Sequence, residues 1–308
     1  MFVVCGEALM DVYLGDSTPT GTRLDARIGG SPLNVVQGLA RLKRPAAFLS
    51  ALSTDALGER LLASLVAEGV DTSLVLRSDA PSTLSVVSID ASGVPRYDFH
   101  GNGAADRQLT PDTLPALPAD TRVLQLGSYA LVVEPVGSTL RALAQAARAS
   151  CLIAYDPNVR LNVEPDIARW REVVEGMISL AHLVKVSEED LALLYPDETP
   201  EQVAPRWLMQ GAALVTVTRG GAGSSAWTAK ARIDAPSEPV KVIDTVGAGD
   251  TFQAALLTWL DEHDALTPAT LTALGDRQLE ALLRFAAQAA AITCSRRGAD
   301  MPTRAELP

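Results

Sequence analysis

The run Asp244–Phe252, with the sequence DTVGAGDTF, contains the residues best suited to chemistry. Its small residues Gly247, Ala248 and Gly249 allow backbone N–H groups to converge just before a predicted helix that starts at Asp250. The positive end of a helix dipole favours a phosphate at such a place. A carboxylate beside that anion site could accept the proton of an incoming hydroxyl. An ordinary capped helix, in which Asp250 only complements the dipole, explains the same residues from turn chemistry alone.

Other polar groups follow predicted strands, where open α/β sheets bind their ligands. Asp11 comes shortly after the first strand, and Arg160 ends the run Asp156–Arg160 after a later one. The glycine-rich segment Thr218–Gly223 follows a third strand. Each has a simpler explanation, namely a solvated loop acid, a surface arginine and a hairpin turn. No GxxxxGK[ST] run is present, which excludes a P-loop as the route to a nucleotide.

The elements that would position these groups alternate along the chain. Short apolar runs predict strands at Phe2–Cys5, Ala46–Ala51, Val123–Leu126, Cys151–Tyr155, Leu183–Val186, Ala213–Thr218, Ser224–Trp227 and Val240–Ile243. Apolar residues at spacings of three and four predict helices at Pro32–Leu42, Leu57–Glu68, Val136–Ala149, Trp170–Leu180, Asp250–Asp261 and Leu279–Thr293. This alternation predicts an α/β fold with a mostly parallel central sheet and helices on both faces.

One region departs from the alternation. Thr83–Asp90 and Pro95–His100 read as two strands joined around Ser92-Gly93, with no helix between them. Together with Val12–Ile28 they predict a small β-sheet that projects from the main body. We expect a lid, formed roughly by residues 12–28 and 83–105, on a single domain spanning residues 1–308. An exposed sheet of this kind suits closure over a ligand or contact with a second copy.

Composition narrows the class of protein. The chain has 308 residues, 47% hydrophobic and 20% charged, with a net charge of −11. These values indicate a globular protein, and no apolar run is long enough to span a membrane. The acidic balance and the four scattered lysines argue against nucleic acid as a partner. The start MFVVC has no basic region or cleavage motif, and Cys5, Cys151 and Cys294 lack CxxC spacing, so we expect a cytoplasmic protein.

Two motifs far apart in the sequence resemble those of one family. Asp244–Phe252 is similar to the D-T-x-G-A-G-D-x-F signature of ribokinase-like (PfkB) carbohydrate kinases, and Gly29–Asn34 to their GG-x-x-x-N signature. The resemblance implies the ribokinase-like fold and ATP-dependent transfer of a phosphoryl group to a sugar hydroxyl. It assigns Asp250 as the base, residues 247–249 as the anion site, and Arg160 as a cation that reaches the phosphates.

The same resemblance implies binding residues. Asp11, Asn34, Gly29 and Gly30 would bind sugar hydroxyls, while Phe99 would either stack on the sugar or pack within the lid. Nucleotide contacts would come from Ser187, Thr218, Arg219, Gly220, Gly223, Gly249, Ala286 and Ala287.

Cation sites are implied as well. The run Ser187–Asp190 stands where the family has N-x-x-E, so Asp190 would influence Mg²⁺ through water, as Mg²⁺ prefers. A helix cap by Ser187 with acids in the first turn explains the run equally and is compatible with it. A possible K⁺ site would involve Asp244, Val246, Thr293 and Gly298.

Three positions bear on the sugar. Gly30-Ser31-Pro32 and Gly127 resemble fructokinases more than ribokinases, and Gly101 stands where related lids often carry arginine. An acid sugar needs a cation for its carboxylate, because an unpaired buried charge is costly. We therefore expect a fructokinase that makes fructose 6-phosphate, and a homodimer formed through the lid. A 2-keto-3-deoxygluconate kinase, another sugar or nucleoside kinase of the family, and a catalytically inactive sugar- or nucleotide-binding protein are the alternatives.

Overall fold

The main sheet follows the predicted alternation. The computed structural model describes residues 1–89 and 95–308, and in it the main sheet has the order β13-β12-β11-β10-β9-β8-β1-β4-β5. Its strands are β1 (Phe2–Cys5), β4 (Ala46–Ser53), β5 (Val75–Ser78), β8 (Val123–Gly127), β9 (Leu152–Asp156), β10 (Leu183–Ser187), β11 (Leu214–Thr218), β12 (Ser224–Trp227) and β13 (Arg232–Ala235). Neighbouring strands pair in parallel from β5 to β11, whereas β12 and β13 add antiparallel pairs at one edge.

Helices cover both faces of this sheet. They are α1 (Ser31–Arg41), α2 (Ala56–Ala67), α3 (Val136–Ala147), α4 (Ile167–Ile178), α5 (Glu188–Leu194), α6 (Pro200–Gln210), α7 (Ala248–Glu262), α8 (Pro268–Ala273) and α9 (Asp276–Cys294). Successive residues of β1 alternate between two apolar cores: Phe2 and Val4 pack with α1, α7 and α9, while Val3 and Cys5 pack with α3 and α4. The predicted α/β class with helices on both faces is confirmed.

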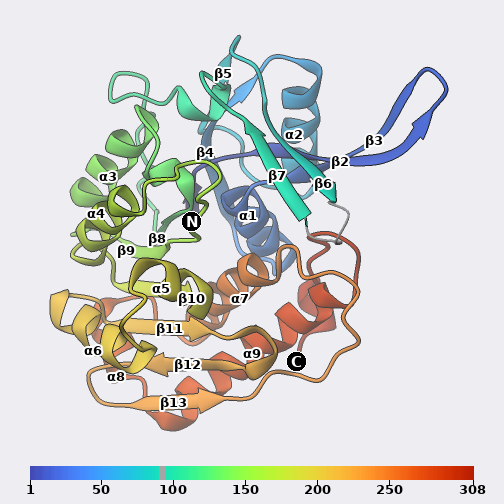
Figure 1. Ribbon diagram of the computed structural model, residues 1–308. Helices are drawn as coiled ribbons and strands as arrows, with labels where there is room; N and C mark the ends of the chain where they lie inside the picture. Colours follow the sequence, from blue (N-terminus) through green and yellow to red (C-terminus); the bar gives the residue numbers. More distant parts are fainter. Residues whose placement is uncertain (90–94) are drawn as a thin grey trace.

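A second, smaller sheet has the order β3-β2-β6-β7. It consists of β2 (Leu9–Thr18), β3 (Gly21–Gly29), β6 (Thr83–Ile89) and β7 (Pro95–His100), with β2 parallel to β6 and the other two pairs antiparallel. The far end of the β2–β3 hairpin extends away from the rest of the molecule (Figure 1). The segment predicted at Val12–Ile28 is therefore this hairpin, and the turn predicted at Ser92-Gly93 lies outside the described residues.

One predicted strand is wrong. Val240–Ile243 pairs with no described strand, and its apolar side chains are exposed, Val242 at 58% and Ile243 at 62%. The edge of the sheet is already formed by β13, whose four residues Arg232–Ala235 carry too little apolar pattern to predict a strand. The segment 236–247 instead leads from β13 to α7 and borders the cavity described below.

No helix within residues 1–89 and 95–308 combines the length and apolar character that crossing a membrane requires.

Candidate active site

A cavity of about 1180 Å³ lies where the main sheet, the small sheet and the N-terminus of α7 meet. Its walls include residues that follow β1, β9, β10 and β11, which is the carboxyl edge of the parallel strands. Ligands bind at this edge in open α/β sheets. The small sheet contributes Asp11, Tyr13, Ser85, Tyr97 and Phe99 to the same wall.

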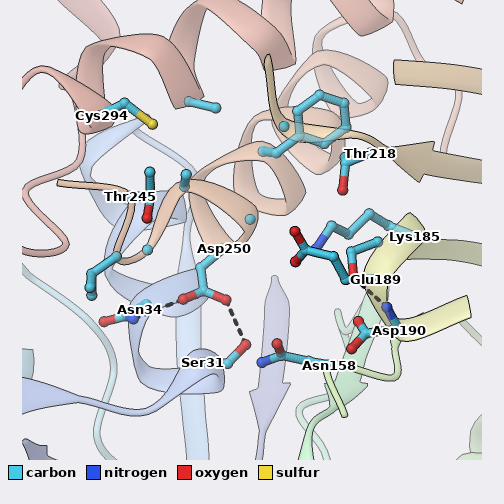
Figure 2. A pocket seen from close by; sticks show the side chains of 18 of the residues that line it. Ser31, Asn34, Asn158, Lys185, Glu189, Asp190, Thr218, Thr245, Asp250 and Cys294 are labelled. Atoms are coloured by element: carbon cyan, nitrogen blue, oxygen red, sulfur yellow. Dashed lines mark hydrogen bonds between the residues drawn. The ribbon is translucent and has the colours of Figure 1, made fainter. Parts of the chain in front are cut away.

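Asp250 lies in the first turn of α7 and joins the two signature motifs. Its Oδ1 accepts a hydrogen bond from Ser31 Oγ at 2.6 Å, and its Oδ2 accepts one from Asn34 Nδ2 at 2.8 Å (Figure 2). Ser31 begins α1, and Asn34 is buried within its first turn. Asp250 is 9% exposed and lines the cavity. Two neutral donors therefore fix the orientation of the carboxylate.

The turn that precedes α7 requires glycine. Gly247 is the N-cap residue with φ 76°, in the left-handed region that glycine adopts most readily. A Cβ at this position would also lie 2.5 Å from Ala299 Cβ. Gly247, Ala248 and Gly249 all line the cavity at the N-terminus of α7, where a helix favours an anion, and the Ala248 N–H donates to the Thr245 carbonyl at 3.2 Å.

Asp11 lines the cavity at the end that the resemblance assigns to the sugar, the sugar end. It is on β2, in register with Arg27 on β3 and Ser85 on β6. Burial raises the pKa of Asp11, and the Ser85 hydroxyl and the charges of Arg160 and Arg27 lower it in part. Gly29 does not line the described cavity wall. It makes room for Asp11, because a Cβ there would lie 2.4 Å from Asp11 Oδ2.

Arg160 is exposed and lines the cavity, with its Nη1 donating to the Val159 carbonyl at 2.9 Å. Its charge acts on Asp11 and Glu7, which places it nearer the sugar end than the sequence analysis expects.

Glu7 is a site residue that the sequence analysis missed. It follows β1 after Gly6, is 1% exposed and lines the cavity beside Ser128. Burial raises the pKa of Glu7 to about 8, and the charge of Asp106 adds to this increase, whereas the Ser128 hydroxyl and the charge of Arg160 lower it in part. Its Oε2 has no hydrogen-bond partner among the described residues. The signal in the sequence was the position of Glu7 directly after the first predicted strand, where ligands bind in open α/β sheets.

The aromatic residues of the small sheet pack as well as line the site. Phe99 lies edge-on to Tyr129 with ring centroids 6.0 Å apart, and both line the cavity. The Tyr129 hydroxyl donates to Asp106 Oδ2 at 2.9 Å. Gly101 lies against Arg107, because a Cβ at Gly101 would lie 2.7 Å from Arg107 Nη2. The guanidinium of Arg107 thus lies beside the position where related lids often carry arginine.

A buried ion pair forms the floor between the sheet and α7. Lys185 Nζ on β10 donates to Asp156 Oδ2 on β9 at 2.7 Å, and the two side chains are 5% and 3% exposed. Burial raises the pKa of Asp156 to about 6, an effect that Lys185 reduces and that Asp190 and Asp250 increase. Lys185 was not predicted as a site residue, although a lysine in an otherwise apolar strand indicates a buried charge with a specific partner.

Most of the residues that the resemblance assigns to nucleotide contacts line the same cavity. Ser187, Thr218, Arg219, Gly220, Gly223, Gly249 and Ala287 line the cavity. Ala286 instead packs in the core at 0% exposure, because it lies on the inward face of α9. Arg219 donates to Ser225 Oγ and lies 3.5 Å from Asp234 Oδ1, so its guanidinium is held against β12 and β13.

The expected cation residues fall into two groups. Asp190 lines the cavity, where its Oδ1 accepts from Val159 N at 3.0 Å and its own N–H donates to Ser187 Oγ at 3.0 Å (Figure 2). Ser187 is thus the N-cap of α5, as the capping explanation predicts. No group of three or more acidic, cysteine or histidine side chains within residues 1–89 and 95–308 could hold a metal ion.

The second group lies behind the turn that precedes α7. Asp244 Oδ2 accepts from Gly298 N at 2.8 Å, and its Oδ1 accepts from Val246 N at 3.1 Å. Thr293 is buried and shares a hydrogen bond of 2.9 Å with Thr251. Of these, Val246 lines the cavity, and the other members of the predicted set form a framework that joins the turn to the C-terminal segment within the described chain.

A carboxylate beside a helix N-terminus, in a cavity at the carboxyl edge of a parallel sheet, suits a phosphotransferase that acts on a hydroxyl group. The chain belongs to the pfkB family of carbohydrate kinases, whose model matches residues 1–305.

Individual proteins similar to this chain include fructokinases. The chain is 36% identical over 279 residues to a fructokinase of Rhizobium leguminosarum bv. trifolii, covering 91% of this chain and 85% of that protein. It is 34% identical over 316 residues to fructokinase-1 of Oryza sativa subsp. japonica, covering 100% and 96%. The crystal structure of a fructokinase with bound ATP from Xylella fastidiosa superposes with a TM-score of 0.88 at 26% identity, covering 99% and 96%. The predicted family and ribokinase-like fold are confirmed.

Proposed function

We propose that this carbohydrate kinase transfers the γ-phosphoryl group of ATP to the primary hydroxyl of D-fructose and forms fructose 6-phosphate. The observation that carries the proposal is Asp250, buried at the N-terminus of α7 and oriented toward the cavity by Ser31 and Asn34. Relatives named fructokinase and the ATP-bound Xylella fastidiosa fructokinase support the choice of substrates.

Asp250 accepts the proton of the sugar hydroxyl as that oxygen attacks the γ-phosphorus. The new P–O bond forms while the bond to the β-phosphate oxygen breaks, and ADP leaves with the electron pair. Charge on the transferring group is stabilised by the N–H groups of residues 247, 249 and 250, which line the cavity at the positive end of α7. Asp11, Asn34 and the Gly30 backbone bind the other hydroxyls, and the small sheet closes over them to exclude water.

The site suits a divalent cation whose ligands are mainly water molecules and phosphate oxygens rather than protein side chains. When bound, Mg²⁺ neutralises the phosphate oxygens and favours departure of ADP. Asp190, which lines the cavity, would hold it through water. A K⁺ ion would lie near Asp244 and Gly298, where the turn before α7 meets the C-terminal segment.

Fructose is favoured over an acid sugar by the charged groups that line the cavity. Arg107 is the cation beside Gly101, but its guanidinium lies 5.6 Å from the Tyr129 ring centroid and is not part of the described cavity wall. A sugar carboxylate would therefore find the Asp11 carboxyl nearby, and only Arg160 as a cation that lines the cavity within the described sugar end.

Two further features belong to the proposal. The free cysteines Cys5, Cys151 and Cys294 favour a reducing compartment such as the cytoplasm. The exposed hairpin of the small sheet supports a homodimer formed through the lid.

A coupled assay that measures ADP release with ATP and a panel of sugars tests the function. Fructose should give the highest kcat/KM, and 2-keto-3-deoxygluconate, ribose and nucleosides should give lower values. Faster turnover of the acid sugar would overturn the choice of fructose and leave the kinase assignment in place. Binding of sugar and ATP without turnover of any of them would favour an inactive binding protein.

A further inference from the structure

A buried lysine faces the anion site at the N-terminus of α7. Lys185 lies at the third position of β10, between Val184 and Val186, which pack into the core on the opposite face of the sheet. Because side chains alternate along a strand, Lys185 points to the same face as Leu183, which packs with α7 and α9. Its side chain therefore extends toward α7 and lines the cavity.

The register of β9 and β10 explains how the ammonium is held. Leu183 pairs with Ala154 and Val184 with Tyr155, so the next position places Lys185 beside Asp156. Lys185 Nζ donates to Asp156 Oδ2 at 2.7 Å, and no other hydrogen bond of this nitrogen occurs within the described residues. An ammonium group has three donors. Two of them therefore remain for a ligand in the cavity.

The position of this nitrogen is tied to Gly249. A Cβ at Gly249 would lie 3.1 Å from Lys185 Nζ, so the ammonium lies against the backbone of the anion site itself. Figure 2 shows Asp250 with Asn34 and Ser31 on one side of the site, and Lys185 with Asp190 and Glu189 on the other. Burial lowers the pKa of Lys185, but the charges of Asp156, Asp250 and Asp190 outweigh that effect and raise it, which keeps the ammonium charged.

A buried ion pair is seldom retained for stability alone, because the cost of removing both charges from water offsets their attraction. We propose that Lys185 is a catalytic residue whose ammonium, oriented by Asp156, contacts the γ-phosphoryl group during its transfer to the sugar. This inference rests on the proposed kinase function. As the P–O bond to ADP breaks, the two free donors of Nζ stabilise the transferring group from the side opposite to Asp250.

The test compares Lys185→Met with the double variant Lys185→Met/Asp156→Asn. The double variant removes both charges, so that no unpaired buried carboxylate remains to unfold the protein. The exposed Lys230→Met is the matched control. We expect each Lys185 variant to lose kcat by about 10²–10³, as for removal of one preorganised donor, while both KM values change by less than about threefold. Lys185→Arg should recover part of the rate, and Lys230→Met should keep all of it.

Two results would overturn the proposal. One is a folded double variant, judged by an unchanged melting transition, whose kcat remains within about threefold of the parent. The other is a raised KM for ATP at unchanged kcat, because that pattern describes a ground-state contact.

A second readout does not depend on the sugar. Titration of MgADP with and without aluminium fluoride measures affinity for a mimic of the transferring group. The parent should bind the fluoride complex more tightly, and Lys185→Met should lose that increment while its affinity for MgADP alone stays the same. Equal increments in both proteins would contradict the role of Lys185, even if the parent phosphorylated none of the sugars. If the parent phosphorylated none of the sugars but the increments differed, only the proposed function would be contradicted.

Discussion

At the scale of single residues, two carboxyl groups of the site differ in their hydrogen bonding and surroundings. Asp250 receives two hydrogen bonds from neutral donors at 2.6 and 2.8 Å, which fix its direction. Glu7, at the sugar end of the same cavity, is buried with an oxygen that lacks a partner among the described residues. The proposed base is therefore fixed in direction by two donors, whereas burial favours the protonated form of Glu7.

Replacing the proposed base tests the first of these roles. Asp250→Asn keeps the size of the side chain and removes its ability to take the proton from the hydroxyl. We expect kcat to fall by about 10²–10⁴, the usual contribution of a positioned general base. The KM for fructose and the melting temperature should change little, because Ser31 and Asn34 still have a polar partner. Steady-state kinetics check this, and near-normal turnover would show that Asp250 is not the base.

Glu7 predicts a dependence of stability on pH. Its pKa rises from an ordinary 4.5 to about 8 because of burial, so in this range the unfolded chain is ionised while the folded chain is protonated. Ionisation then favours unfolding, and the contribution of Glu7 to the free energy of unfolding falls as pH rises from 4.5 to 8. Glu7→Gln removes this effect, and its stability relative to the parent should increase by about 3 to 5 kcal/mol across that interval.

Urea unfolding at pH 5, 6, 7 and 8 measures this difference. The surface variant Glu172→Gln, whose side chain is 71% exposed, is the control and should follow the parent at every pH. A constant difference between Glu7→Gln and the parent would mean that Glu7 is ionised in the folded protein.

At the scale of elements, the turn before α7 combines a backbone requirement with a close contact. Gly247 has φ 76°, and a Cβ there would lie 2.5 Å from Ala299 Cβ. Gly69, which follows α2, has φ 75° and no neighbour within 4 Å of such a Cβ. The two glycines therefore differ in packing and agree in backbone conformation.

This pair allows the contact to be measured separately. Gly69→Ala should cost about 1 kcal/mol through its left-handed backbone, whereas Gly247→Ala should cost about 2 to 4 kcal/mol, because overpacking against Ala299 adds to that cost. Gly247→Ala should also lower kcat, since the N–H groups of the anion site must shift, and Gly69→Ala should leave kcat unchanged. Thermal or urea unfolding with kinetics on both variants checks this. Equal losses of stability in the two variants would show that the segment containing Ala299 moves away from residue 247 at no cost in free energy.

The elements also show what the sequence could predict. Buried parallel strands such as β1 and β8 are nearly continuous apolar runs, and the structure matches their predicted positions to within a residue. Val240–Ile243 has the same apolar character but reaches no free sheet edge, and composition cannot reveal that β13 already occupies it. The motifs placed Asp250 and Asn34 in one site. Lys185 and Glu7 were missed because their roles arise from cross-strand register and burial, which involve residues distant in the sequence.

At the scale of the whole molecule, the small sheet has two surfaces with different tasks. One contributes Asp11, Tyr13 and Phe99 to the cavity wall. Farther along the β2–β3 hairpin, Leu14 and Leu24 pair in register and are 48% and 61% exposed. Cross-strand partners share a face of the sheet, so these leucines form one apolar spot on an element that extends from the body (Figure 1). A second copy of the chain would bury this spot and hold the hairpin in place over the site.

The proposed homodimer can be tested through these two leucines. Burying the exposed half of a leucine contributes about 1 to 1.5 kcal/mol, so four such side chains in a symmetric dimer contribute roughly 4 to 6 kcal/mol. The double variant Leu14→Ser/Leu24→Ser should therefore raise the dimer dissociation constant by roughly 10³-fold or more. Sedimentation velocity over a range of concentrations measures this constant, with Met209→Ser, 82% exposed on α6, as the control that should leave it unchanged.

Because the hairpin carries Asp11, the KM for fructose should rise as the variant dissociates, while the KM for ATP should stay the same. A parent protein that sediments as a monomer at all concentrations, or a dimer that the double variant leaves intact, would contradict an interface on this hairpin.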